Sequence, residues 1–578
     1  MTEKVIYSTE PEDFDYIAVN VPCQMACPVH TNIPAYIRCL FGGRYDRSYE
    51  INRLSNLFPG VLGRICSRPC EDRCRHGEAE LGKPVNICHI KRAAADLMER
   101  DSIPRYTLNC SIGKNVAVIG GGPSGLAAAH DLAMFGISVT IYEALDKLGG
   151  MLRYGIPDFR LPRRILDSEI NSILETGVTV KRGVRVGIDL TVEDMLDSYD
   201  AVLIAAGCSE SIPLNMPGEG LRGIYSGLKF MFDICSHKPV DIGEKVIVIG
   251  AGFTAFDCAR SALRLGAKDV SICLRRTEED LSVTVDEIHE AKAEGVKILS
   301  LMLTRRIIGR NKVEGVEFVR TQPGEIQSDG KREIYPIKGS EFVLSADSVV
   351  IAVGQRPQAM SIFGDNTNRG TITARKNFFQ TSVKGLYLSG DYLSGPSTVI
   401  EAISTGRKAA EKIARDLTGK RFNELVVCIR NSQITDRQRT WDFIPRQKTP
   451  TVSSIKERLR FSDKEVETGY SHDHAREESK RCYLCYLHYE IDLSRCIYCR
   501  YCIDVAPRDC IKMVETIKTN QNGAINGFVE TTIWHNVNAI IIDNYRCIRC
   551  GECMRVCPVK CISVTRIELQ ERLIDKKE

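Results

Sequence analysis

Two short apolar runs in the middle of the chain are each followed at once by glycines. Residues 114–119 (KNVAVI) run into GGGPSG, and residues 245–249 (KVIVI) run into GAGFTA. A continuous apolar run of this length is typical of a parallel strand that is buried on both faces. Each pattern therefore predicts a buried strand, a tight turn and a helix, which together open a dinucleotide-binding fold.

The first pattern continues as such a fold requires. It predicts a helix from about Leu126 to Phe135 and a second strand from about Ser138 to Tyr142, which ends at Glu143. An acid at this position accepts hydrogen bonds from a ribose, while the glycines and the helix N-terminus receive a pyrophosphate. The residues expected to hold this first nucleotide are Gly120, Gly122, Pro123, Ser124, Gly125 and Glu143.

The second pattern differs at the ribose position. Its next strand, Val270 to Leu274, ends in Arg275 and Arg276 instead of an acid. Guanidinium groups bind a 2′-phosphate that a carboxylate would repel, so this site should prefer NADP(H). The residues expected here are Gly250, Gly252, Thr254, Ala255, Arg275, Arg276 and Gly354, the last of which ends the apolar run 348–354.

After the second fold the sequence returns to the first. Residues 385–391 (GLYLSGD) predict a strand that ends in Gly390 and Asp391, where an Asp commonly binds the ribityl or phosphate part of FAD. A helix follows at Thr398, and its N-terminus would favour negative charge on a reduced flavin. One tightly held flavin and one exchangeable nicotinamide are thus expected. The nicotinamide domain (225–355) is inserted into a flavin domain made of 113–224 and 356–425.

Cysteine is the unusual component of the composition. The chain has 578 residues, 24 cysteines and a formal net charge of +4, which gives no reason to expect nucleic acid as a partner. Most cysteines lie in two groups, Cys23–Cys88 and Cys482–Cys561. The N-terminal residues lack the apolar core of a signal peptide, and no run approaches the ~20 apolar residues of a membrane helix. A disulfide framework fits poorly, and the tight spacing favours metal binding in a cytoplasmic protein.

The C-terminal cysteines form two repeats about fifty residues apart. The second repeat, C-x2-C-x2-C-x3-C-P, matches the run of a bacterial two-cluster ferredoxin, in which each fourth cysteine ligates the cluster of the other repeat. This run is typical of iron–sulfur proteins, which disfavours a zinc module. One complete ligand set results, and it consists of Cys496, Cys499, Cys502 and Cys557.

The other ferredoxin set lacks its expected fourth ligand. It holds Cys547, Cys550 and Cys553, but Ala506 stands where the fourth cysteine should be. Cys510 could substitute, although Cys561 occupies the equivalent place beside an intact Cys557, so that Cys510 could also be a packed thiol. A three-iron cluster or a non-cysteine ligand would equally account for the missing cysteine.

With these motifs in place, residues 20–425 resemble the small subunit of bacterial glutamate synthase. They are also similar to the matching parts of dihydropyrimidine dehydrogenase and of the large subunit of NADH-dependent reduced ferredoxin:NADP oxidoreductase. The segments that carry the resemblance are CQMACPVHTNIP, GRICSRPCEDRC, VAVIGGGPSGLAAA, GGMLRYGIP, VIVIGAGFTAFDCAR, LRR and GLYLSGD. The resemblance implies FAD in the first fold, with Gly150 at the FAD site, NADPH in the second fold, and [4Fe–4S] clusters in the N-terminal domain.

The resemblance also frames two arrangements of the N-terminal cysteines. Related proteins usually carry two clusters here, and an upstream R-C-x-x-C pair serves one of them; in this chain the upstream pair is missing. Either one cluster is held by four of the N-terminal cysteines, or the segment Arg481-Cys482-x2-Cys485 is the missing pair, relocated. In the first case the ligands come from Cys23, Cys27, Cys66, Cys70 and Cys74, with Cys88 as a substitute. In the second case one set is Cys23, Cys74, Cys482 and Cys485, and the other is Cys27, Cys66, Cys70 and Cys88.

Together these features predict a multidomain α/β protein. Its parts are a helical iron–sulfur domain (1–112), the two Rossmann-like nucleotide domains, a linker (426–480) and an α+β ferredoxin-like domain (481–578). Nicotinamides exchange two electrons as hydride and clusters exchange one, while a flavin does both, so FAD must lie between them. The predicted function is electron transfer between NADP(H) and a ferredoxin or another redox protein, through FAD and three or four [4Fe–4S] clusters. No catalytic acid or base is expected.

Two further functions are compatible with parts of the sequence. The chain could be the NADPH-oxidising subunit of a hetero-oligomer whose partner subunit is glutamate synthase-like or acts on a 2-oxoacid or an acyl-CoA, with electron bifurcation as an option. A disulfide reductase of the thioredoxin-reductase type would need a redox-active cysteine pair near the flavin. The cysteines of the nucleotide domains form no C-x-x-C pair, which disfavours that function.

Overall fold

The structure of the chain is a computed structural model. It describes residues 14–78, 82–99, 110–327, 332–358, 379–432, 444–452, 454–461, 463–519 and 525–574. The chain forms two compact units. The cluster unit consists of Met1–Arg105, Arg421–Thr449 and Gly469–Glu578, and the nucleotide unit consists of Tyr106–Lys420 and Pro450–Thr468. Among the described residues, no helix combines the length and the apolarity needed to cross a bilayer.

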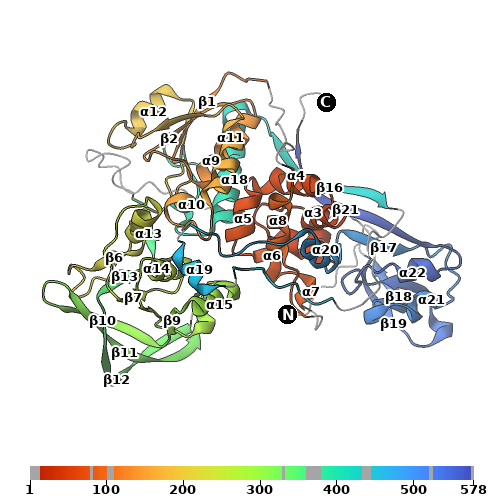
Figure 1. Cartoon of the computed structure of the whole chain (residues 1–578). Helices are drawn as coiled ribbons and strands as arrows, with labels where there is room; N and C mark the ends of the chain where they lie inside the picture. The colour runs from red at the N-terminus through yellow and green to blue at the C-terminus, as the bar shows by residue number, and fades with distance from the viewer. Residues whose placement is uncertain are drawn as a thin grey trace. The chain divides into compact units, whose positions relative to one another are not determined.

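The first sheet of the nucleotide unit is parallel, with the strand order β15-β4-β1-β2-β3. Its central strand, β1, carries buried side chains at four of its five positions, as the apolar run predicts. Its strands are β1 (Asn115–Ile119), β2 (Ser138–Glu143), β3 (Thr179–Arg182), β4 (Ala201–Ile204) and β15 (Leu386–Leu388). The helices of this part are α9 (Pro123–Met134), α10 (Met151–Tyr154), α11 (Arg163–Leu174), α12 (Val192–Ser198), α17 (Asp391–Ser394) and α18 (Val399–Thr418). Figure 1 shows α9 packed along α18.

The second sheet has the order β6-β13-β7-β8-β9 and is also parallel. Its strands are β6 (Ile224–Ser226), β7 (Lys245–Ile249), β8 (Asp269–Cys273), β9 (Lys297–Leu299) and β13 (Ser348–Ile351). Beside it lie a three-stranded antiparallel meander of β10 (Met302–Gly309), β11 (Val313–Ile326) and β12 (Arg332–Ser345), and the short pair β5 (Glu210–Ser211) and β14 (Gln355–Arg356). The helices are α13 (Gly227–Cys235), α14 (Phe253–Arg264), α15 (Val285–Glu294) and α19 (Ile455–Arg460). The strands predicted from the two apolar runs are therefore confirmed.

The N-terminal part of the cluster unit is helical because its apolar residues recur at helical spacing. Its helices are α1 (Phe14–Asn20), α2 (Pro22–Ala26), α3 (Ile33–Phe41), α4 (Tyr45–Asn56), α5 (Pro59–Ile65), α6 (Pro69–Asp72), α7 (Arg75–Glu78) and α8 (Ile87–Asp96). Helix α20 (His472–Lys480) comes from far along the chain and packs on α3 and α8. This packing brings the residues that follow α20 to the N-terminal cysteines.

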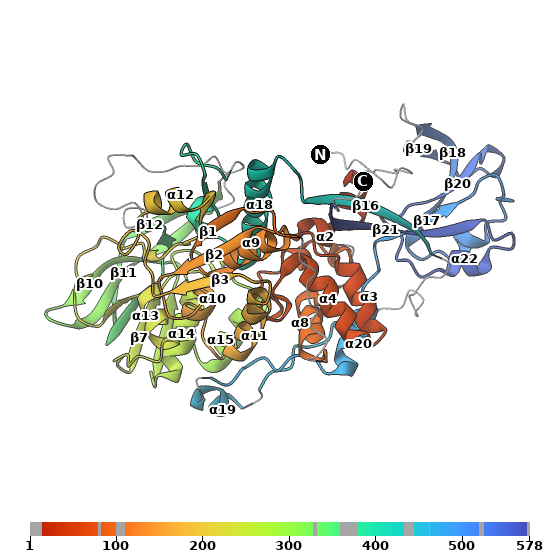
Figure 2. The ribbon, with the colours of Figure 1, turned by 90° about the horizontal axis from the view of Figure 1, so that it is seen from above.

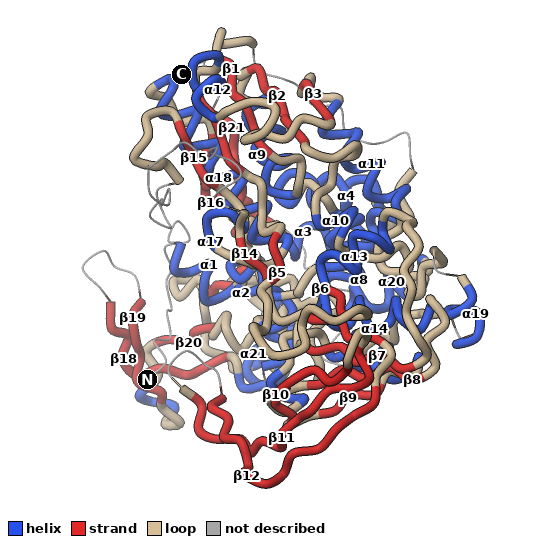
Figure 3. Tube along the Cα trace, turned by 90° about the vertical axis from the view of Figure 1, so that its left-hand side faces the viewer, coloured by secondary structure: helices blue, strands red, loops and turns tan. Residues whose placement is uncertain are grey.

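The C-terminal part of the cluster unit contains two small antiparallel sheets. One has the order β16-β21-β17 and consists of β16 (Asn423–Ser432), β17 (Leu487–Ile491) and β21 (Ile562–Leu573). The other has the order β19-β18-β20 and consists of β18 (Ile511–Thr519), β19 (Ile525–Glu530) and β20 (Ala539–Ile542). The short helices α21 (Tyr501–Asp504) and α22 (Glu552–Val556) carry cysteines. Figure 2 shows β16 alongside β21, and Figure 3 shows β18, β19 and β20 as strands of one sheet.

The stretch 426–480, predicted as a linker, contains regular structure where it is described. β16 pairs with β21 over ten residues, from Asn423 opposite Leu573 to Ser432 opposite Val564. Helices α19 and α20 also lie in this stretch. The domain boundaries given above stay predictions.

Candidate nucleotide and iron–sulfur sites

The first glycine loop of the nucleotide unit is shaped by close packing. Gly120 has a φ of +102°, which favours glycine, and α9 begins one residue after Gly122. A Cβ on Gly125 would lie 2.0 Å from the carbonyl oxygen of Gly120. Gly125 therefore lets the helix approach the strand, as the fingerprint requires.

Glu143 ends β2 and faces this loop. One of its carboxylate oxygens accepts a hydrogen bond from the backbone N–H of Gly121 at 2.8 Å, and the other accepts one from Leu145 N–H at 2.9 Å. Burial raises the pKa of Glu143 above its ordinary value. The carboxylate thus also fixes the glycine loop, a role that the sequence alone does not reveal.

The residues that return from the second sheet complete the same site. A Cβ on Gly390 would lie 2.8 Å from the Cβ of Ser124, and the Ser124 hydroxyl donates to Ser389 Oγ at 2.9 Å. Asp391 accepts a hydrogen bond from the Ser397 hydroxyl at 2.6 Å, and burial raises its pKa. The first loop and the Gly390–Asp391 turn therefore lie together, although about 265 residues separate them in sequence.

Gly122 and Gly150 approach each other closely beside the loop that would receive the pyrophosphate of a dinucleotide. The nearest heavy atom to a Cβ on Gly122 would be Gly150 Cα at 3.8 Å, and Gly150 itself has a φ of +51°. Thr398 caps α18, because its hydroxyl accepts from Glu401 N–H. These residues fit a flavin dinucleotide: two glycines without side chains lie together at the loop, and a buried acid stands at the ribose end.

The second glycine loop repeats this design. A Cβ on Gly250 would lie 2.4 Å from the carbonyl oxygen of Ala352, whereas a Cβ on Gly252 would meet nothing within 4 Å. Arg275 is exposed just beyond β8, and the Arg276 Nε donates to the carbonyl oxygen of Arg332 at 2.9 Å. Arg275 is therefore the more accessible of the two cations for a 2′-phosphate. Thr254 and Ala255 lie in the first turn of α14, and Gly354 has a φ of +145°.

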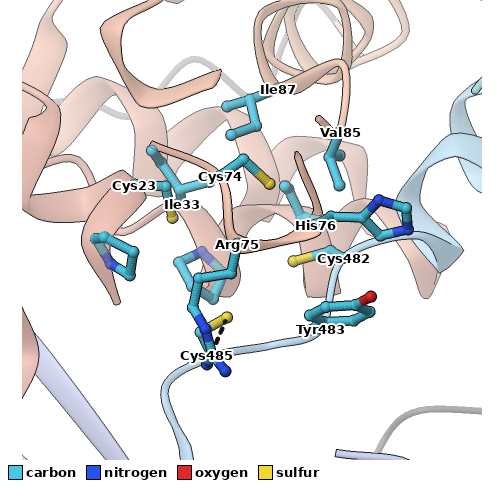
Figure 4. A pocket seen from close by; sticks show the side chains of 13 residues that line it. Cys23, Ile33, Cys74, Arg75, His76, Val85, Ile87, Cys482, Tyr483 and Cys485 are labelled. Atoms are coloured by element: carbon cyan, nitrogen blue, oxygen red, sulfur yellow. Dashed lines mark hydrogen bonds between the residues drawn. The ribbon is translucent and has the colours of Figure 1, made fainter. Parts of the chain in front are cut away.

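Four cysteines from both ends of the sequence surround one pocket of the cluster unit. Cys23 and Cys74 line it together with Cys482 and Cys485. Figure 4 shows their sulfur atoms directed toward a common space between the helices and the 482–485 loop. The buried Arg75 donates to the Cys485 sulfur at 3.6 Å.

Three of the other N-terminal cysteines, Cys66, Cys70 and Cys88, form a second group. The thiols of Cys66 and Cys70 each contact that of Cys88. Lys91, one turn along α8 and also buried, lies near this group and near Cys27. Burial opposes the charge of Lys91, but the surrounding cysteines outweigh burial and raise its pKa. Nothing in the sequence pattern singles out Lys91 or Arg75, because a lone cation in a helix is usually solvated.

The ferredoxin part holds two further groups of cysteines. One pocket is lined by Cys496, Cys499, Cys502, Cys557 and Cys561. The other is lined by Cys510, Cys547, Cys550 and Cys553. Ala506 lines the second pocket as well, so that Cys510 reaches the space that the missing fourth cysteine would have filled.

Three C-x-x-C loops of the cluster unit share one backbone conformation. The residue before the second cysteine is Leu484, Tyr498 or Arg549, with φ values of 52°, 56° and 58°. In two of these loops its N–H donates to the sulfur of the first cysteine at 3.4 Å, Leu484 to Cys482 and Arg549 to Cys547. Positive φ is uncommon for residues other than glycine, so its recurrence marks a common loop type. The 482–485 loop thus has the conformation of the ferredoxin loops.

These groups supply thiol side chains, which are the usual ligands of iron–sulfur clusters. Among the residues that the structure describes, no three His, Cys, Asp or Glu side chains converge closely enough to hold a single metal ion. A [4Fe–4S] cluster has a different ligand requirement, because each of its four irons binds a thiolate from a different direction around a shared core. The four groups of cysteines fit a cluster by donor type, and three of the groups each line one pocket.

Comparison with known proteins decides the family. The family model described as pyridine nucleotide-disulphide oxidoreductase matches residues 114–406. The chain belongs to the pyridine nucleotide-disulphide oxidoreductase family. Two further models flank this family's domain: dihydropyrimidine dehydrogenase domain II, a 4Fe-4S cluster domain, matches residues 17–103, and a 4Fe-4S dicluster domain matches residues 495–562.

Curated relatives of this pyridine nucleotide-disulphide oxidoreductase match between about two thirds and four fifths of the chain. The chain is 36% identical to the NADP(+)-dependent formate dehydrogenase subunit beta of Moorella thermoacetica, over 81% of this chain and 71% of that protein. It is 34% identical to the NADPH-Fe(3+) oxidoreductase subunit beta of Geobacter sulfurreducens, over 80% and 75%. It is also 34% identical to the glutamate synthase [NADPH] small chain of Escherichia coli, over 68% and 88%.

These matches confirm the resemblance to the glutamate synthase small subunit and the presence of a fused two-cluster ferredoxin module. The chain is an NADPH-dependent flavin oxidoreductase, and its cofactors are FAD, NADP(H) and [4Fe–4S] clusters. Its activity is electron transfer between NADP(H) and the clusters through FAD.

Proposed function

We propose that the chain is the NADP(H)-handling subunit of a larger redox complex, and that it connects FAD to a partner protein through four [4Fe–4S] clusters. FAD, when bound, converts two-electron exchange with NADP(H) into one-electron exchange with a cluster. The protein's part is to hold each group in place and to set its potential.

The observation that carries this proposal is the pocket of Cys23, Cys74, Cys482 and Cys485. It supports the relocated C-x-x-C arrangement over a single N-terminal cluster, because it separates Cys23 and Cys74 from the group around Cys88. Four sets of four ligands result. They are Cys27, Cys66, Cys70 and Cys88; Cys23, Cys74, Cys482 and Cys485; Cys510, Cys547, Cys550 and Cys553; and Cys496, Cys499, Cys502 and Cys557.

The cluster held by Cys496, Cys499, Cys502 and Cys557 is the proposed exit. Three of these cysteines are only partly buried. The apolar side chains of Ile497 and Tyr501 beside them are 58% and 55% exposed. A partner redox protein, either a ferredoxin or a catalytic subunit, would meet this cluster most directly. The relatives named formate dehydrogenase subunit beta and glutamate synthase small chain are subunits, which supports a hetero-oligomer.

Anaerobic purification followed by iron and flavin analysis tests the proposal. We expect one FAD and about sixteen iron atoms per chain, since each cluster holds four. Titration with NADPH should bleach the flavin and produce the electron paramagnetic resonance (EPR) signals of reduced clusters, and NADH at equal concentration should do so less well. About twelve irons would mean three clusters and would contradict the four-cluster relay. Reduction of the flavin by NADPH without reduction of any cluster, in a protein with full iron, would contradict this direction of flow and make reduced ferredoxin the donor to test.

A further inference from the structure

Arg549 joins two of the cysteine loops through one buried side chain. It is 0% exposed. Its Nε donates to the carbonyl oxygen of Leu487 at 3.1 Å, and its two terminal nitrogens donate to the carbonyl oxygens of Cys485, at 3.3 Å, and of Cys547. Cys485 and Cys547 belong to different four-cysteine sets, so a single guanidinium spans the boundary between them.

A second contact holds the same two segments together. The side chain of Asn544 accepts a hydrogen bond from Tyr489 N–H at 2.9 Å and donates to the Tyr489 carbonyl oxygen at 2.9 Å. Tyr489 follows the 482–485 loop by four residues, and Asn544 precedes Cys547 by three. The two loops are therefore fixed side by side at two points.

The equivalent position of the other ferredoxin loop is built differently. Tyr498 stands there with the same positive φ as Arg549, and its hydroxyl donates to the carbonyl oxygen of Asn538 at 2.9 Å, inside the ferredoxin part. The bridging cation is thus a feature of the loop that carries the atypical set with Cys510.

A buried guanidinium has a predictable effect on nearby clusters. An arginine stays charged in proteins, and a buried cation is costly unless negative charge lies close to it. A thiolate-ligated cluster becomes more negative when it takes an electron, so a fixed cation stabilises its reduced form. Because Arg549 contacts a ligand residue of each set, it favours the reduced state of both clusters.

We propose that Arg549 is a positioning residue shared by two clusters: it holds the cluster of Cys23, Cys74, Cys482 and Cys485 beside that of Cys510, Cys547, Cys550 and Cys553, and raises both reduction potentials. The second of these clusters is then the entry point of electrons into the ferredoxin module, ahead of the exposed cluster. This inference rests on the four-cluster relay proposed above.

The test compares Arg549→Gln and Arg549→Lys with the matched control Arg546→Gln. Arg546 lies one residue before Cys547, and its side chain is 54% exposed. Each protein is purified anaerobically with its iron and flavin counted, and its clusters are titrated against potential by EPR. Arg549→Gln should lower the potentials of two clusters, each by a roughly tenfold shift in the one-electron equilibrium (about 59 mV). In Arg549→Lys, which keeps the positive charge, the reduction potentials of both clusters should stay close to those of the wild type. Arg546→Gln removes the same charge but should shift the potentials far less, because water screens it.

The outcomes separate this inference from the proposed function. A wild-type protein short of iron contradicts the four-cluster relay itself. Full iron in every variant, with Arg549→Gln no different from Arg546→Gln or with a shift in one cluster only, overturns the shared role of Arg549. If Arg549→Gln does not assemble its clusters, the placement of the two clusters is tested by a measurement on the wild-type protein. The EPR signal of the Cys547 cluster should then relax faster in the fully reduced wild type than in Cys482→Ser/Cys485→Ser, and equal relaxation would overturn the placement.

Discussion

The nucleotide folds and the pocket of Cys23 and Cys74 are assembled in opposite ways. In the nucleotide folds, strand, glycine turn and helix follow one another within about thirty residues, so one short segment carries most of each site. In the pocket, Cys23 and Cys74 meet Cys482 and Cys485 from the other end of the chain. Local motifs fix their own geometry, whereas a site made of distant segments depends on everything that holds those segments together.

Substitutions in the pocket of Cys23, Cys74, Cys482 and Cys485 should therefore have the largest effect on electron transfer. Cys482→Ser/Cys485→Ser should remove about a quarter of the iron, because one of four clusters loses half of its ligands. Reduction of the flavin by NADPH should persist, since the nucleotide unit is untouched. Electron delivery to the ferredoxin clusters should fall to a small fraction of the wild-type rate, as measured by freeze-quench EPR after mixing with NADPH.

The matched control replaces two cysteines that line none of the three cysteine pockets, Cys110 and Cys428, which are exposed and partly exposed. Cys110→Ser/Cys428→Ser should keep all of its iron. Equal iron in both double variants would remove Cys482 and Cys485 from the ligand sets and return the N-terminal domain to a single cluster.

A change inside a nucleotide fold should act locally and still be large. Gly125→Ala would place a Cβ 2.0 Å from the Gly120 carbonyl oxygen, and neither backbone segment can move aside easily. We expect destabilisation at or above about 3 kcal/mol and loss of most of the bound FAD, measured by urea unfolding and by the flavin-to-protein ratio. Gly220→Ala, where a Cβ would meet nothing within 4 Å, should leave both unchanged. A fully flavinylated Gly125→Ala protein would show that the loop does not need this close approach.

The same contrast between local and distant contacts explains which features of the structure could be predicted from the sequence. The strands at 114–119 and 245–249 and the helix after Thr398 follow from apolar runs, glycines and a capping residue, all of which act over a few residues. The Cys482 pair could be linked to the N-terminal cysteines only through a resemblance, because no local pattern says which distant segment α20 will approach. The role of Arg549 was not predicted from the sequence for a related reason. A lone arginine inside a C-x-x-C loop is usually solvated, and only packing shows that this one is buried against two loops.

Non-local support also exists within the NADP(H) fold, and its loss should have an intermediate effect. Glu294 on α15 accepts hydrogen bonds from Arg260 and Arg264 of α14 at 2.8–3.0 Å, and its side chain is fully buried. Burial alone would raise its pKa, but the two guanidinium groups outweigh burial and lower the pKa of Glu294 to about 2. The lowering from 4.5 corresponds to about 3 kcal/mol of stability at neutral pH, which Glu294→Gln should remove.

The pH dependence of the unfolding free energy, compared between wild type and Glu294→Gln, tests whether the charge of Glu294 causes this stabilisation. Above about pH 4.5 Glu294 is ionised in the folded and the unfolded state, so its contribution is fully present. As the pH falls from 4.5 toward 2, the unfolded chain binds the proton first and the contribution disappears. The difference in unfolding free energy between wild type and Glu294→Gln should therefore shrink over that window. A difference that stays constant with pH would assign the loss to packing instead of charge.

The smallest effect is expected at the exposed end of β8, where a purely local inference can be tested without disturbing the fold. Arg275 is exposed, and Arg276 is engaged with the Arg332 carbonyl oxygen, so Arg275→Gln should cost contacts only with the 2′-phosphate. We expect kcat/KM for NADPH to fall about tenfold, near 1.4 kcal/mol, through KM, while kcat/KM for NADH stays the same. Arg305→Gln, an exposed arginine on β10 that pairs with Glu341 at 2.7 Å, removes the same charge from the same unit and should leave the ratio unchanged. An equal loss for NADPH and NADH in Arg275→Gln would mean that this arginine acts on the nucleotide as a whole, and the preference for NADP(H) would then have to come from Arg276.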